Sequence, residues 1–218
     1  MGLAIGVGVL ADLIIHDPEG ADWTRRSLAG LNAALQRAGL PEHHEPERFV
    51  RAPHTSMRSC TSFPYSFLHY LRRAFAHVRE GLPVPDDDTL RPEHDQVVED
   101  ASTMFDSHLL CHSDAEGFYV PIDLSSRPGN RAEFAEPIFD DDVPGGMLGS
   151  SHALLRELIE VAPHIGVTLD NARPTPACEA ALQAIEDSGP LWRERLVWYT
   201  LFEAATISVE YNTLIVFH

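Results

Sequence analysis

Apolar residues recur every three or four positions in several segments, the spacing that places side chains on one face of a helix. This pattern predicts helices over residues 22–38, 64–80, 92–104, 150–162, 176–187 and 190–209. A proline at the first helical position supports the helix that begins at Pro64. The apolar stripes of these helices predict seven core residues: Leu68, Leu71, Phe75, Leu154, Leu158, Leu196 and Phe202.

Strand signals are few and short. Residues 3–15 are almost continuously apolar, but Gly6 and Gly8 interrupt them, so the segment is either a strand near 3–9 or the start of a helix. Segments 108–113 and 118–122 predict a hairpin, because Gly117 can supply the positive φ of the turn between them. The sequence therefore predicts a mainly helical α+β fold, with a small antiparallel sheet around a 108–122 hairpin, in a single domain over residues 1–218.

The composition fits a globular protein of a reducing compartment. The 218 residues are enough to bury a sizeable core, and no apolar run reaches the length of a membrane-spanning helix. The apolar start of the chain lacks the basic residues of a secretory signal, which favours a cytoplasmic location. We expect Cys60, Cys111 and Cys178 to be free thiols, because their number is odd and their spacing wide.

The strongest global feature is negative charge. The chain has 33 acidic and 16 basic residues, a formal net charge of −17. Such a surface repels phosphate backbones and anionic lipids, so we expect a basic protein surface as partner and neither nucleic acid nor membrane. The acidic run Asp140, Asp141 and Asp142 is the candidate partner surface, and the alternative is that the charge serves solubility alone.

All the basic residues are arginine, and the absence of lysine excludes whole reaction classes. No Schiff base can form with pyridoxal phosphate or with a class I aldolase substrate. A Walker A phosphate loop would also lack its lysine. No cofactor is expected on these grounds, although a divalent metal remains possible.

One candidate small-molecule or metal site lies on the predicted hairpin. Residues two apart on a strand share a face, so His108, His112 and Asp114 would point the same way, with Asp123 near the second strand. Imidazole and carboxylate groups together can hold a divalent metal or act as a general base. The alternative is that these histidines bond to neighbouring carbonyl groups or lie exposed on the sheet.

Two further segments are candidate anion sites. Tyr65, His69 and Arg72 are three or four residues apart on one predicted helix, and together could bind a carboxylate or phosphate. Gly149, Ser150 and Ser151 form a turn that enters another helix, where free N–H groups attract anions. The alternatives are an exposed helix flank for the first set and a plain serine cap for the second.

Two functions remain open from the sequence. The first is a protein-binding module with acidic loops, for example a toxin-neutralising immunity-type protein. The second is a small-molecule enzyme or metal-binding protein that uses the His108, His112 and Asp114 site. The chain has no G-x-S-x-G or G-x-G-x-x-G motif that would favour a particular enzyme class, and it leaves the oligomeric state open.

Overall fold

The computed structural model describes residues 2–50, 62–86, 95–127, 136–185 and 188–218. It confirms the α+β class: the described residues form eight α-helices, a six-stranded sheet and a separate two-stranded sheet. None of the helices in these segments has the length and apolar character needed to cross a bilayer. The single-domain prediction is not tested by this arrangement.

The bounds of the described helices are α1 Val9–His16, α2 Pro18–Arg37, α3 Tyr65–Arg79, α4 Gln96–Ser102, α5 His108–Cys111, α6 Ser151–Val161, α7 Pro176–Gln183 and α8 Trp192–Tyr211. Each of the six predicted helices corresponds to a described helix, and α1 and α5 are additional. Six of the seven predicted core residues are buried, and Leu196 is partly exposed instead. The broad buried face of α8 places Val197, Trp198 and Leu201 in the core beside Phe202.

The main sheet is mixed. Its order is β2-β1-β8-β3-β5-β4, with β1 Leu3–Val7, β2 Ser62–Phe63, β3 Gly117–Val120, β4 Ile138–Phe139, β5 Met147–Ser150 and β8 Ile215–Phe217. Strands β3 and β5 are parallel and the other pairs are antiparallel. The short strands β6 Leu169–Asp170 and β7 Arg173–Pro174 pair with each other.

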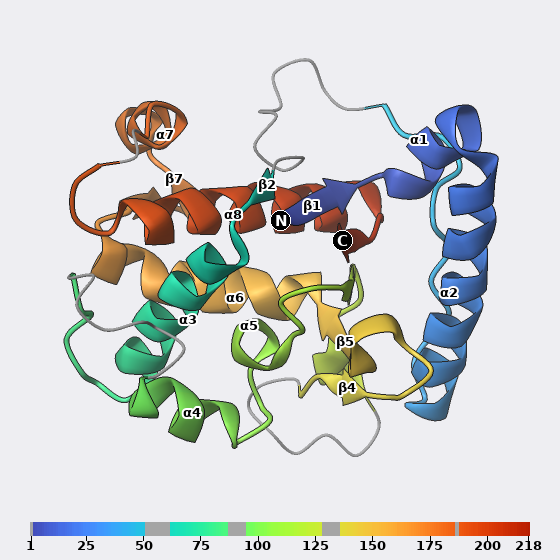
Figure 1. The fold of residues 1–218 in the computed structure, drawn as a ribbon, viewed down its shortest axis with the longest axis horizontal. Helices are drawn as coiled ribbons and strands as arrows, with labels where there is room; N and C mark the ends of the chain where they lie inside the picture. The colour runs from blue at the N-terminus through green and yellow to red at the C-terminus, as the bar shows by residue number, and fades with distance from the viewer. Residues whose placement is uncertain (1, 51–61, 87–94, 128–135, 186–187) are drawn as a thin grey trace.

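Helices cover both faces of this sheet, as the alternation of strand residues requires. Tyr119, Ile215 and Phe217 belong to the larger core, which is formed with α3, α6 and α8. Phe118 and Val216 point to the opposite face and pack with residues of α2. Figure 1 shows α2 standing apart from the group of α3, α6 and α8.

Two local predictions need correction. Residues 3–15 contain both predicted alternatives, first strand β1 and then helix α1. Gly8 separates the two elements with a positive φ of 67°. The predicted 108–122 hairpin is wrong: residues 108–111 form helix α5, and the antiparallel neighbour of β3 is the C-terminal strand β8. The predicted antiparallel sheet is therefore a mixed sheet that joins distant parts of the chain.

Candidate functional site: a polar pocket and an acidic surface

Helix α5 is held at its N-terminus by side chains that satisfy its free N–H groups. The Ser107 hydroxyl accepts the N–H of Leu110 at 3.0 Å. The Glu157 carboxylate reaches across from α6 and accepts the N–H groups of His108 at 2.8 Å and Leu109 at 2.7 Å. A carboxylate at this position is also favoured by the positive end of the helix dipole.

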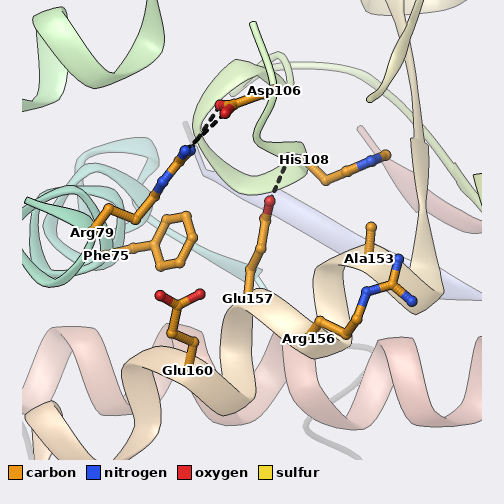
Figure 2. Close-up of a pocket in the computed structure, with 8 residues that line it drawn as sticks. All are labelled: Phe75, Arg79, Asp106, His108, Ala153, Arg156, Glu157 and Glu160. Carbon is orange, nitrogen blue, oxygen red and sulfur yellow. Dashed lines mark hydrogen bonds and ion pairs between the residues drawn. The ribbon is translucent and has the colours of Figure 1, made fainter. Parts of the chain in front are cut away.

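A pocket of about 150 Å³ lies between α3, α5 and α6, beside this contact. Figure 2 shows its lining residues: Phe75, Arg79, Asp106, His108, Ala153, Arg156, Glu157 and Glu160. Arg79 donates two hydrogen bonds of 2.8 Å to the carboxylate of Asp106, which lowers the pKa of Asp106. Burial raises the pKa of Glu157 to about 7. Glu157 can therefore exchange a proton near neutral pH, but the described residues that line the pocket offer no hydroxyl or thiol nucleophile.

The two histidines of the predicted hairpin site do not share a strand face. His108 begins helix α5, and its Nδ1 accepts the backbone N–H of Ser150 at 2.8 Å. His112 lies just after α5, with its ring stacked on Tyr119 at 4.2 Å between ring centroids. Its Nδ1 is 2.9 Å from the carbonyl of Ser113, and burial lowers the pKa of His112 to about 4. The strand geometry on which this site was predicted is therefore wrong.

The two carboxylates of the same predicted site have other partners. Asp114 lies 3.0 Å from Nε2 of His69, which belonged to a different candidate set. Asp123 accepts the N–H of Ser125 at 3.1 Å and lies 3.4 Å from Arg156. Within the described ranges, no group of three or more His, Cys, Asp or Glu side chains could hold a metal ion.

The α3 candidate set is divided between the surface and the interior. Tyr65 is partly buried against the large core, whereas Arg72 is buried. The Arg72 guanidinium donates to the carbonyl of Leu109 at 2.9 Å and to the carbonyl of His112. Burial lowers the pKa of Arg72. Arg72 therefore binds the C-terminal end of α5, and the arrangement does not present it to an external anion.

The glycine-rich turn before α6 is also not available to an external anion, because its hydroxyl groups bond within the protein. The Ser150 hydroxyl caps α6 by accepting the N–H of Ala153 at 3.3 Å, and it donates to the carbonyl of Ile122 at 2.7 Å. The hydroxyl groups of Ser151 and Ser208 are 2.6 Å apart. Gly149 lies so close to Tyr119 that a Cβ would be 2.3 Å from the ring. All three candidate residues are buried, as in the serine-cap alternative.

The acidic run beside β4 is only partly available. The Asp140 carboxylate binds the guanidinium of Arg37 from α2, which lowers the pKa of Asp140. Asp141 is exposed, and the side chain of Asp142 is 70% exposed although it lies 3.2 Å from Arg37. Asp141 and Asp142 are thus the members of the predicted partner surface that can meet another molecule.

Glu157 was not among the residues predicted from the sequence. This residue lies between Leu154 and Val161 at the three- and four-residue spacing of the buried stripe of α6. A single acidic residue in an apolar stripe is a signal for a buried polar contact, and it could have been noticed. The cysteine prediction is confirmed for Cys111 and Cys178, which are free, and Cys60 lies outside the described residues.

Comparison with known proteins gives one match. No curated protein and no solved structure matches the chain at a significant level. A family model described as "Putative DNA-mimic protein" matches residues 1–217. This match corrects the expectation that the partners have nothing to do with nucleic acid, since a DNA mimic would be recognised by proteins that bind DNA. Because the match covers all but the last residue, the chain belongs to the family that this model describes.

Proposed function

We propose that this protein binds the DNA-binding site of a partner protein and thereby excludes DNA from it. The observation that carries the proposal is the family match over residues 1–217. The net charge of −17 supports it, because a site that binds phosphates attracts carboxylates by the same electrostatic force. A cytoplasmic location fits this function, since Cys111 and Cys178 are free thiols.

The distribution of charge on the described surface also supports the proposal. Three exposed arginines are engaged by carboxylates: Arg25 binds Asp22 and Glu47, Arg37 binds Asp140 and Asp142, and Arg156 binds Asp123. Exposed acidic side chains occur on several elements, including Asp12, Glu19, Glu99, Asp100, Asp141, Asp142 and Glu160. The surface therefore presents carboxylates to a partner, as the DNA backbone presents phosphates.

The test is mutual exclusion between this protein and DNA. The tagged protein captures its partner from a lysate of its host, and the partner is then purified by itself. Fluorescence anisotropy measures the binding of labelled DNA to that partner while unlabelled protein is added. We expect the protein to displace the DNA completely, and both complexes to weaken as salt increases.

Capture alone does not support the proposal, because any acidic protein can retain basic proteins at low salt. A ternary complex of partner, DNA and this protein would contradict it. The matched control is bovine serum albumin, another acidic protein, which should displace DNA poorly at equal concentration. If albumin displaced DNA equally well, negative charge alone would explain the displacement.

A further inference from the structure

An exposed aromatic pair lies where the end of α4 meets strand β4. Phe105 is 60% exposed and Phe139 is 48% exposed, and their ring centroids are 5.5 Å apart in an edge-to-face arrangement. Met104, which is 67% exposed, precedes Phe105 directly. Both elements lie on the same side of the molecule in Figure 1. Large apolar side chains that gather in solvent are typical of a surface that binds another molecule.

The backbone holds the Phe105 ring in this position. Phe105 has a φ of 55°, in the left-handed region that a bulky side chain rarely occupies. The next residue, Asp106, is bound by two hydrogen bonds from Arg79, and Ser107 caps helix α5. A strained backbone that presents a phenyl ring to water persists only when the surrounding contacts fix it. These contacts therefore hold the backbone from which the Phe105 ring projects.

Exposed carboxylates lie close along the chain to both members of this aromatic pair. Asp141 and Asp142 follow Phe139 by two and three residues, and both are exposed. Glu99 and Asp100 are exposed on α4, about one helical turn before Met104. Two residues of extended chain span at most about 7 Å, so Asp141 lies within that distance of Phe139, measured between Cα atoms. The surface thus combines an apolar centre with an acidic rim, as energetically effective protein interfaces do.

We propose that Phe105 and Phe139 form the centre of the surface that binds the partner, and that this partner binds single-stranded DNA. The inference rests on the proposed function and specifies the class of its target. Sites for single-stranded DNA combine arginine and lysine residues with aromatic side chains on which bases stack. The phenyl rings take the place of the exposed bases, and the nearby carboxylates take the place of the phosphates.

Charge and chemistry both favour this partner over a protein that binds duplex DNA through its backbone. In a duplex the bases are stacked inside, so a site that contacts only phosphates offers cations and little apolar surface. Such a site would leave Phe105 and Phe139 against charged groups. A site for single-stranded DNA offers aromatic side chains to the apolar centre and basic side chains to the acidic rim.

The test uses the partner captured as described above and two variants, Phe105→Asn and Phe139→Thr. Asparagine tolerates a positive φ, and threonine keeps the preference for a strand, so each removes a ring with little strain. The matched control is Ile15→Thr, which removes an exposed apolar side chain, 74% exposed, from α1. Circular dichroism and urea midpoints establish that the three variants fold.

We expect each ring variant to weaken partner binding by about tenfold or more, as for residues at the centre of an interface. Ile15→Thr should leave the affinity unchanged. The partner should bind labelled oligothymidine more tightly than a labelled duplex of the same sequence length. The wild-type protein should displace the oligothymidine, and the ring variants should displace it only at about tenfold higher concentration.

Three results would overturn the inference. The first is unchanged affinity of folded Phe105→Asn and Phe139→Thr; the second is a partner that prefers duplex DNA. The third is a wild-type protein that dimerises in solution when the ring variants are monomers, because a second copy would then cover the pair. In each case wild-type protein can still exclude DNA from the partner, so the proposed function would stand. Failure of wild-type protein to exclude DNA would instead refute the proposed function itself.

Discussion

Two polar side chains from neighbouring helices fix the short helix α5 from both ends. Glu157 accepts the N–H groups of His108 and Leu109, and Arg72 donates to the carbonyl groups of Leu109 and His112. The negative group lies at the positive end of the helix dipole and the positive group at the negative end. A helix of one turn is not stable by itself, so these hydrogen bonds supply the stability that a longer helix gains from its own backbone.

The first prediction at this scale concerns pH and Glu157. Its pKa is raised from 4.5 to about 7 in the folded protein, so folding binds a proton between those values, and the free energy of unfolding falls as pH rises through them. Glu157→Gln should remove this contribution, which we expect to be roughly 1–3 kcal/mol. Urea denaturation of both proteins at a series of pH values measures the difference in stability between them.

His112 has the opposite effect on the pH dependence of the free energy of unfolding. The wild-type protein is therefore compared with Glu157→Gln, which keeps His112. Its pKa is lowered from 6.5 to about 4, so the unfolded chain binds the extra proton, and the free energy of unfolding rises with pH in that range. The two contributions partly cancel in the wild-type protein. In Glu157→Gln the stability should therefore rise with pH up to about 6.5. Parallel pH profiles for the two proteins would show that Glu157 has an ordinary pKa in the folded state.

A second residue-scale prediction separates two leucines that the sequence pattern treats alike. Leu71 is fully buried in the large core, whereas Leu196 is partly exposed on α8. Leu71→Ala should lower the free energy of unfolding by about 2–5 kcal/mol, and Leu196→Ala by clearly less. Urea midpoints of the two variants test this difference. Equal losses would mean that Leu196 is as buried as Leu71.

At the scale of elements, apolar periodicity predicted the long helices but not α5. Helices such as α3 and α6 carry several turns of stripe, so their spacing alone reveals them. The segment from His108 to Cys111 is too short for a period to show, and its conformation depends on Glu157, 49 residues away from His108. The hairpin geometry of the His108, His112 and Asp114 site was wrong for the same reason, because it required side-chain directions that only tertiary contacts decide.

The cap of α6 gives a prediction at this scale. The Ser150 hydroxyl accepts the N–H of Ala153 and donates to the carbonyl of Ile122, so it joins the start of α6 to the loop after β3. Ser150→Ala should lower the free energy of unfolding by about 1–2 kcal/mol. The control Ser66→Ala changes an exposed serine on α3 and should be nearly neutral. Thermal denaturation of both variants measures the two effects, and equal stability of the two would argue against the cap.

At the scale of the whole molecule, the sequence revealed the charge but not how it is displayed. The net charge of −17 already favoured a protein partner, and the family match directs that expectation to proteins that bind DNA. The fold then decides which acidic residues are available. Arg37 binds both Asp140 and Asp142, but Asp142 stays largely exposed and Asp141 is exposed as well, both close to Phe139 in the chain. The run of three acids in the sequence is therefore two exposed acids beside an aromatic pair in the structure.

The last prediction asks whether local charge or total charge recruits the partner. Reversal of Asp141 and Asp142 to arginine changes the net charge by as much as reversal of Asp170 and Glu179, which are exposed near α7. Figure 1 shows α7 far from β4. Electrostatic steering depends most on charges near the contact, so the first pair should slow association about tenfold at low salt and the second pair much less. Stopped-flow association rates across a salt series test this, and equal slowing by both pairs would mean that only the total charge matters.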